Sequence, residues 1–274
     1  MTRVALYQSN SGIDAAANAE ALVDAAGRAA DGGAAMLFTP EMVNLLDRDR
    51  RRAAEAIVPE HDDATVAAAC RAAGDHGLWI HLGSVAVATD DGKWVNRSIL
   101  VDPSGSIMAR YDKMHLFDVD VGPGNRWRES DVYRAGQRAV RVKDTPVGAM
   151  GMTICYDLRF PALFARLAEA GAKVVTVPAA FTVPTGEAHW HVLLRARAIE
   201  AGMFVIAAAQ DGVHADGRET YGHSLVVDPW GEVLLDMGNG AGVGFADIDL
   251  DRIDAVRERI PAISHRREVA RLDD

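Results

Sequence analysis

Only two cysteines, Cys70 and Cys155, occur in the 274 residues of this chain. Two thiols are too few for a disulfide framework in a chain of this size, so we expect both to be free. No apolar run approaches the roughly 20 residues that span a bilayer, and the first residues lack the apolar core of a signal peptide. The sequence therefore predicts a cytoplasmic protein with no membrane partner.

The chain also lacks an excess of basic residues. Its 29 Lys and Arg against 39 Asp and Glu give a formal net charge of −10. Nucleic-acid-binding surfaces are normally basic, so no nucleic-acid partner is expected. No proline-rich, serine-rich or single-sign charged linker divides the sequence, and no long repeat of a solenoid type is visible. With 49% hydrophobic residues, the sequence predicts one globular domain over residues 1–274.

Apolar strands alternate with helical segments along the chain. It begins with a predicted strand, helix and strand at residues 3–8, 14–30 and 35–38. Two similar turns, VDPSG at residues 101–105 and VDPWG at residues 227–231, each join two apolar runs and suggest an internal half-repeat. The pattern predicts a mixed α/β fold in which helices cover the sheets.

Cys155 lies where an apolar run ends and the chain turns toward a helix after Pro161. Such a turn exposes a nucleophile and leaves free backbone N–H groups beside it, which would lower the thiol pKa and provide an oxyanion donor. The alternative is a buried core cysteine, which fits Cys70 in its alanine-rich segment well. Position alone does not decide between these roles for Cys155.

Two charged residues also follow apolar strands. Glu41 comes just after the strand expected at residues 35–38, and Lys113 ends the strand-like run at residues 107–112. Strand ends are where α/β sheets collect their active sites, although an exposed loop glutamate and a solvated lysine are the ordinary alternatives. A carboxylate that can act as acid or base, a cation and a thiol have complementary catalytic roles. Glu41, Lys113 and Cys155 would therefore form an active site if the fold brings them together. Spacing alone does not show that it does.

The segments that contain these three residues resemble the signatures of the nitrilase superfamily of carbon–nitrogen hydrolases. The similarity runs essentially from end to end, through residues 38–41, 111–118, 151–161, 188–190, 195–200, 221–224 and 227–231. It implies a four-layer α-β-β-α sandwich, a catalytic triad of Glu41, Lys113 and Cys155, no cofactor, no metal, and a homodimer or larger homo-oligomer paired through the outer helical layer.

A second glutamate belongs to the family pattern, and here Glu129 supplies it. The resemblance implies that Glu129 orients Lys113 and the substrate amide by hydrogen bonding. The alternative is a capping or surface residue in a turn-rich segment.

The implied reaction is hydrolysis of an amide through a thioester. Cys155 would attack the amide carbon while Glu41 takes up the thiol proton. Lys113 and the backbone N–H of Tyr156 are the expected oxyanion donors, and one such donor is typically worth about 3 to 4 kcal/mol of barrier. Glu41 would then protonate the departing ammonia and activate the water that releases the acid.

The substrate expectation also rests on resemblance. CYDLR at residues 155–159 is similar to the amidase-like Nit branch, whereas true nitrilases carry tryptophan and glutamate after the cysteine. Residues 180–190 resemble deaminated glutathione amidases most and omega-amidases acting on 2-oxoglutaramate second. Either substrate has a carboxylate, which Arg159 is expected to bind, with Phe181 and Thr182 lining the pocket. The alternative for Arg159 is an ion pair with Asp157.

Three further features of the sequence resemble parts of a metal or nucleotide site. His189 and His191 would point apart on a helix expected at residues 187–202, so they form no ligand pair. His223 is taken as structural unless three ligands are shown to converge. The glycine-rich segment at residues 238–244 does not match a nucleotide-binding fingerprint and is expected to be a flexible loop between two strands.

Two functions of another class remain beside a metabolite-repair amidase. One is a non-catalytic scaffold of the same fold, and the other is a biosynthetic subunit that passes ammonia or an acyl group to a partner. The intact set of Glu41, Lys113 and Cys155 counts against the scaffold. The absence of an attached synthetase segment counts against the biosynthetic subunit.

Overall fold

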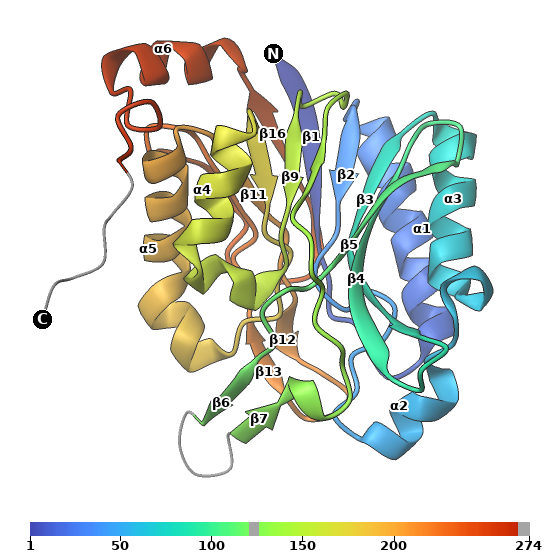
Figure 1. The fold of residues 1–274 in the computed structure, drawn as a ribbon. Coiled ribbons are helices and arrows are strands. Elements are labelled where there is room, and N and C mark those ends of the chain that lie inside the picture. The colour runs from blue at the N-terminus through green and yellow to red at the C-terminus, as the bar shows by residue number, and fades with distance from the viewer. Residues whose placement is uncertain (121–125, 268–274) are drawn as a thin grey trace, which may run out of the picture.

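Two six-stranded sheets lie face to face between two layers of helices in the computed structural model, which describes residues 1–120 and 126–267 (Figure 1). The first sheet has the strand order β16 (Gly242–Ile248), β1 (Thr2–Gln8), β2 (Met36–Phe38), β3 (Trp79–Ala88), β4 (Trp94–Val101) and β5 (Ile107–Asp112). The second has the order β15 (Val233–Asp236), β14 (Leu225–Val227), β11 (Phe204–Ala207), β10 (Val174–Thr176), β9 (Met150–Met152) and β8 (Val140–Val142). The expected four-layer sandwich is confirmed.

Alternating side chains in the first sheet divide its two faces between two cores. Val4 and Leu6 of β1 belong to the hydrophobic cluster that lies between the sheets and reaches the second sheet. Ala5, between them in sequence, belongs to the cluster that packs against the helices. Because side chains in a strand point to opposite faces in turn, both faces of a buried strand must be apolar. This explains the continuous apolar runs seen in the sequence.

Each sheet is covered on its outer face by two helices (Figure 1). The first pair is α1 (Ala15–Asp31) and α3 (Ala64–His76), and the second is α4 (Pro161–Glu169) and α5 (Val183–Ala201). Asp14 and Asp63 cap α1 and α3 by accepting hydrogen bonds from backbone N–H groups of the first turn, as N-cap residues do. The helix expected from residue 187 begins one turn earlier, at Val183, after the N-cap Thr182.

The suspected half-repeat is visible in the sheet topology. In each sheet three parallel strands are followed by two antiparallel ones: β1, β2, β3, β4 and β5 correspond to β9, β10, β11, β14 and β15. The similar turns at residues 101–105 and 227–231 join the last two strands of each set. The two halves therefore use the same local turn at the same place in the fold.

Several elements were not expected from the sequence. They are α2 (Arg50–Ala56), the pair β6 (Asp118–Asp120) and β7 (Arg126–Arg128), and the pair β12 (Asp211–Val213) and β13 (Glu219–Tyr221). They gather at the lower end of the sandwich in Figure 1, whereas α6 (Asp251–Arg259) lies at the opposite end. The prediction of a loop over residues 238–244 is wrong for its last three residues, because Gly242 to Gly244 pair with β1 in the first sheet.

Among the helices of the described part of the chain, none has the length and apolar character needed to cross a membrane. Whether the chain forms one domain over residues 1–274 stays a prediction.

Gly83 in β3 lets two loops approach the sheet closely. Its N–H donates to Thr39 Oγ1 at 2.9 Å, and the pairing of β3 with β4 is irregular at this point. A Cβ atom on Gly83 would lie 2.6 Å from the Pro40 carbonyl oxygen and 2.5 Å from Pro178 Cβ, and closer still to the Thr39 carbonyl oxygen. Glu41 directly follows this segment, so the absence of a side chain at Gly83 fixes where Glu41 begins.

We expect Gly83→Ala to lower the free energy of unfolding by about 1 to 3 kcal/mol, the usual cost of overpacking a core, and to reduce kcat by displacing Glu41. Denaturant unfolding and steady-state kinetics measure the two effects. Gly242→Ala is the matched control, because Gly242 also lies in a strand but a Cβ atom there meets nothing within 4 Å. Equal stability of the two variants would contradict this account of Gly83.

Candidate active site

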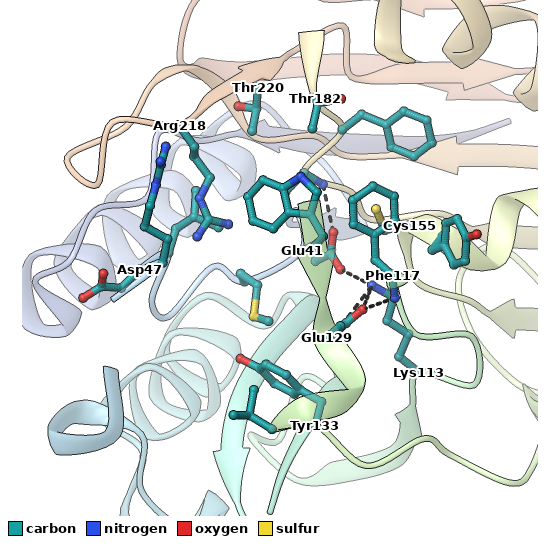
Figure 2. Close-up of a pocket in the computed structure, with 18 of the residues that line it drawn as sticks. Glu41, Asp47, Lys113, Phe117, Glu129, Tyr133, Cys155, Thr182, Arg218 and Thr220 are labelled. Atoms are coloured by element: carbon teal, nitrogen blue, oxygen red, sulfur yellow. Dashed lines mark hydrogen bonds and ion pairs between the residues drawn. The ribbon is translucent and has the colours of Figure 1, made fainter. Parts of the chain in front are cut away.

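Four residues from separate segments line one cavity of about 380 Å³ (Figure 2). Residues of α2, β7 and β13 also line it, which places the cavity at the lower end of the sandwich in Figure 1. Glu41 follows β2, Lys113 directly follows β5, Glu129 begins the short helix η2 (Glu129–Asp131), and Cys155 begins the short helix η3 (Cys155–Arg159) after β9. The strands β2 and β5 belong to the first sheet and β9 to the second. The convergence that spacing alone could not show is therefore present, and both sheets contribute to it.

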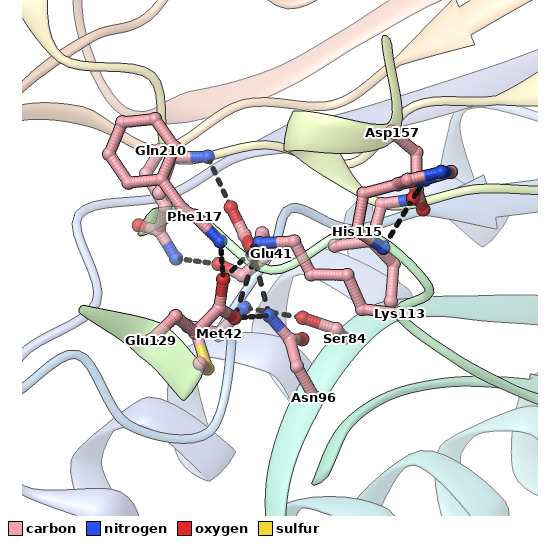
Figure 3. Close-up of polar contacts among 12 residues, drawn as sticks. Glu41, Met42, Ser84, Asn96, Lys113, His115, Phe117, Glu129, Asp157 and Gln210 are labelled. Carbon is pink, nitrogen blue, oxygen red and sulfur yellow. Dashed lines mark hydrogen bonds and ion pairs between the residues drawn. The ribbon is translucent and has the colours of Figure 1, made fainter. Parts of the chain in front are cut away.

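The Lys113 ammonium lies between two carboxylates (Figure 3). Its Nζ donates to Glu41 Oε1 at 2.9 Å and to Glu129 Oε2 at 3.0 Å, and its side chain is 3% exposed. Burial alone would lower the pKa of Lys113, but the charges of Glu129 and Glu41 outweigh it and raise that pKa well above its usual value. The Lys113 side chain therefore stays a cation.

Asn96, on β4, binds both carboxylates, and the sequence patterns did not indicate it. Its Nδ2 donates to Glu41 Oε1 at 2.9 Å and to Glu129 Oε1 at 3.3 Å. A buried asparagine is unusual in a strand of apolar residues, and that was the available signal. Asn96 thus fixes the distance between the two glutamates.

Backbone groups fix the remaining carboxylate oxygens. The N–H of Ala180 donates to Glu41 Oε2 at 3.0 Å, and the N–H of Phe117 donates to Glu129 Oε2 at 2.6 Å. The Glu41 carbonyl oxygen accepts from Gln210 Nε2 at 2.9 Å. Each glutamate is consequently held in one orientation, which makes Glu129 part of the site and not a surface residue.

Cys155 has an uncommon backbone conformation, with φ of 46°. Its N–H donates to the Pro178 carbonyl oxygen at 2.8 Å, and the residue is 7% exposed. Burial, and then the negative charge of Glu41, raise the pKa of the Cys155 thiol well above its usual value, although Lys113 acts in the opposite direction. The expectation that the turn lowers this pKa is wrong for the free protein, because burial and the nearby carboxylate outweigh the turn geometry.

Asp157 holds the turn that carries Cys155. Its carboxylate accepts from the Ile154 N–H at 2.9 Å, from the Tyr111 hydroxyl at 2.7 Å and from the His115 N–H at 3.1 Å, and His115 Nδ1 lies 2.7 Å away. The partners Tyr111 and His115 flank Lys113 in sequence, so this carboxylate links the Lys113 and Cys155 segments. The N–H of Tyr156, by contrast, has no acceptor in the described part of the chain.

Arg159, Phe181 and Thr182 all line the cavity. The sequence predicts this position for Phe181 and Thr182, and the binding of a substrate carboxylate by Arg159 stays a prediction. The Arg159 guanidinium lies 5.6 Å from the centre of the Phe181 ring, and its Nη2 is 3.3 Å from His189 Nδ1. Asp157 is bonded elsewhere and makes no ion pair with Arg159 in the structure. The guanidinium therefore faces the cavity and is available to an anionic group.

Further arginines surround the cavity, and none of them was anticipated. They are Arg48, Arg50, Arg126, Arg128 and Arg218. Arg218 lies over the Trp127 ring at 5.3 Å and also pairs with Asp216 at 2.7 Å. They are scattered through the sequence, so only the fold could show that they form an arginine rim around one cavity, which Asp47 and Glu219 also line.

Comparison with known proteins identifies the class. The carbon-nitrogen hydrolase family matches residues 3–258, and the chain belongs to this family. It is therefore an enzyme that hydrolyses carbon–nitrogen bonds.

The individual relatives narrow the class further. The chain is 41% identical over 246 residues to a deaminated glutathione amidase of Yersinia enterocolitica, an alignment that covers 88% of this chain and 84% of the relative. It is 37% identical over 273 residues to the nitrilase and fragile histidine triad fusion protein NitFhit of Caenorhabditis elegans, covering 96% of this chain and 60% of that longer protein.

Solved structures agree with these relatives. The crystal structure of C. elegans NitFhit superposes with a TM-score of 0.90 at 36% identity, covering 97% of this chain and 65% of that one. An amidase from Nesterenkonia sp. AN1 that carries a covalent adduct at its active-site cysteine superposes with a TM-score of 0.82 at 25% identity, covering 97% and 94%.

We expect the Cys155 thiolate to form only above the ordinary cysteine pKa of about 8.5, because burial and the Glu41 charge disfavour it. Thiolate ultraviolet absorption against pH, measured in a Cys70→Ser background, gives the value. Glu41→Gln should lower the pKa, since it removes a negative charge beside the sulfur. Glu219→Gln, which changes an exposed charge at the cavity wall, should leave it unchanged. A thiolate already present at neutral pH would contradict this assignment.

Proposed function

We propose that the protein is an amidase that hydrolyses the γ-amide of deaminated glutathione through a thioester on Cys155. The observation that carries this proposal is the buried Lys113 ammonium, held between Glu41 and Glu129 beside the Cys155 thiol at the end of a cavity. Thiol, carboxylate and ammonium are the nucleophile, base and oxyanion donor that acyl transfer needs.

The first half of the reaction forms the thioester. Because the thiol is protonated in the free enzyme, Glu41 takes its proton as Cys155 sulfur attacks the amide carbon. Negative charge then develops on the former carbonyl oxygen, and Lys113 Nζ and the Tyr156 N–H donate to it. A fixed ammonium is suited to this role, since it needs no reorganisation when the charge appears.

The second half releases the acid. Glu41 donates its proton to the departing nitrogen and then accepts a proton from the water that attacks the thioester. Glu129 positions Lys113 by hydrogen bonding, while the Phe117 N–H and Asn96 hold Glu129 in turn. One carboxylate therefore transfers protons and the other positions the cation.

The leaving group depends on the substrate. Deaminated glutathione has no primary amide, so cleavage of its γ-amide releases 2-oxoglutarate and cysteinylglycine. The ammonia expected in the sequence analysis fits only a primary amide such as 2-oxoglutaramate, the substrate of the alternative omega-amidase function. Both substrates give the same 2-oxoglutaryl thioester, so the site chemistry is common to them.

Three features support the larger substrate. The relatives named as deaminated glutathione amidases are 40–48% identical to this chain. The cavity of about 380 Å³ extends from Cys155 to a rim with several arginines. Deaminated glutathione carries a carboxylate at each end, so Arg159 can bind the 2-oxo acid end while the rim attracts the other.

To test this choice, kcat/KM is measured with deaminated glutathione and with 2-oxoglutaramate by following 2-oxoglutarate, with Cys155→Ala as the blank. We expect deaminated glutathione to be preferred. Preference for 2-oxoglutaramate would make the protein an omega-amidase, and turnover of neither would favour the non-catalytic scaffold or a partner-fed subunit.

The same assay tests Arg159. Arg159→Leu should lower kcat/KM by about 10- to 100-fold, because a hydrogen bond to a charged group is worth about 1.5 to 3 kcal/mol. Arg166→Gln is the control, since Arg166 on α4 is exposed and pairs with Glu169. An unchanged kcat/KM in Arg159→Leu would mean that Arg159 does not bind substrate.

The expected homo-oligomer is part of the proposal. Large apolar side chains are exposed on α5 and on the neighbouring hairpin of β14 and β15, and the two are joined by a hydrogen bond from Arg195 Nε to the Gly231 carbonyl oxygen at 2.8 Å. The exposed side chains are Val192, Ile199, Trp230, Val233 and Leu234. Such a contiguous face on the outer helical layer suits a second copy of the chain.

Light scattering after size exclusion tests this pairing. We expect a dimer or larger for the wild type and a smaller species for Val192→Glu combined with Ile199→Glu, because charge is costly in an apolar interface. Val23→Glu on α1, at an exposed apolar residue of the opposite helical layer, should not change the mass. A wild-type monomer would overturn the pairing.

Cytoplasmic location and a role in metabolite repair belong to the same proposal. The mechanism needs Cys155 as a free thiol, and a reducing compartment maintains one.

A further inference from the structure

Two histidines and an aspartate outside the cavity converge on the outer side of the second sheet. They are His191 on α5, His223 between β13 and β14, and Asp236 at the end of β15. His189 and His191 do point apart, as expected, since His189 approaches Arg159. His223 nevertheless lies close to two other possible metal ligands, His191 and Asp236, which come from other segments.

We propose that His191, His223 and Asp236 form a binding site for a late first-row divalent metal ion, with Zn²⁺ as the best-fitting case. His191 Nε2 lies 3.0 Å from Asp236 Oδ2, and His223 Nδ1 lies 2.9 Å from Asp236 Oδ1. The three ligand atoms lie within 4.8 Å of one another. Ligands at 2.0 to 2.2 Å around a tetrahedral zinc are about 3.3 Å apart, so binding requires only a small closure of the two imidazoles.

The donor types select the metal class. Two imidazoles and one carboxylate suit zinc, copper and nickel better than magnesium or calcium, which prefer oxygen ligands alone. All three side chains are partly exposed, at 33%, 23% and 33%, so an ion can enter and a water can complete the coordination.

Hydrogen bonds that involve the backbone connect the three segments that supply the proposed ligands. The His223 carbonyl oxygen accepts from Nε1 of Trp190, the residue before His191, at 2.8 Å. The His223 N–H donates to the Gly238 carbonyl oxygen at 2.8 Å, and the Gly238 N–H donates to Asp236 Oδ1 at 2.9 Å. The three ligand segments are therefore joined to one another before any ion binds.

His223 also has an uncommon conformation, with φ of 54°. Residues other than glycine adopt positive φ infrequently, and such positions often mark functional sites. The Tyr221 ring stacks on the His223 imidazole with centres 4.5 Å apart. Backbone and ring thus direct Nδ1 of His223 toward Asp236.

Hydrogen bonds hold the Asp236 carboxylate in place. Its Oδ1 accepts from the Gly238 N–H at 2.9 Å, and its two oxygens lie within hydrogen-bond distance of His191 Nε2 and His223 Nδ1. Without a metal, the same three groups form a hydrogen-bonded network, and that is the competing reading of the cluster.

Calorimetric titration with ZnCl₂ tests the site in a Cys70→Ser, Cys155→Ser background, which removes thiols as competing ligands. We expect one Zn²⁺ per chain. His191→Ala, His223→Asn and Asp236→Asn should each weaken binding at least about 10-fold, a loss that is seen even when only a hydrogen-bond partner of a metal ligand is changed. Asn is chosen at position 223 because it tolerates positive φ. His189→Ala on the same helix is the control and should bind as the parent does.

Cobalt substitution provides a second readout that needs no change at the three proposed ligands. Co²⁺ in the same background should give the intense visible bands of a four-coordinate ion. The weak spectrum of hydrated Co²⁺, or zinc affinity that the three ligand variants do not reduce, would overturn the proposal and leave the cluster as a hydrogen-bonded network.

Discussion

The ion pair of Lys113 with two carboxylates is the interaction on which the site depends. A buried ammonium is costly unless it is paired and fully hydrogen-bonded, and here Glu41 and Glu129 satisfy it from two different segments. Removing either glutamate would leave the buried ammonium without one of its carboxylate hydrogen bonds. The cluster therefore constrains the ends of β2 and β5 and the start of η2 to one geometry, and the fold supplies the backbone N–H groups and Asn96 that complete it.

The second constraint is the turn at Cys155. The Asp157 carboxylate accepts from the Ile154 N–H, directly before Cys155, and from the residues that flank Lys113, so nucleophile and cation are positioned by one carboxylate. The turn comes from the second sheet and the lysine from the first. Closing the sandwich is consequently what assembles the site, and the glycine at position 83 permits the close approach of the loop that leads to Glu41.

Much of the fold followed from local patterns. The alternation of apolar runs and helical segments predicted the first two strands and the first helix to within one residue at each end, and the two similar turns indicated the half-repeat. The short elements around the cavity were missed, because α2, β6, β7, β12 and β13 are too short and too polar to show a period. The start of β16 was assigned to a loop because its glycines resemble one, whereas pairing with β1 makes it a strand.

The residues of the site also fall into those that the sequence predicts and those that only the structure shows. Glu41, Lys113, Glu129 and Cys155 lie in segments with a recognisable pattern, so they could be named in advance. Asn96, the arginine rim and the cluster at Asp236 depend on residues far apart in sequence, and only tertiary structure brings them together. The raised pKa of the Cys155 thiol could not be predicted either, because it results from burial and from the distance to Glu41.

Partitioning of the acyl group between water and hydroxylamine tests the covalent mechanism most directly. If Cys155 forms a thioester, deaminated glutathione and 2-oxoglutaramate give the same 2-oxoglutaryl enzyme, and the ratio of hydroxamate to acid must be identical for both. Ratios that differ between the two substrates would show that water attacks the amide directly, and would contradict the role assigned to Cys155.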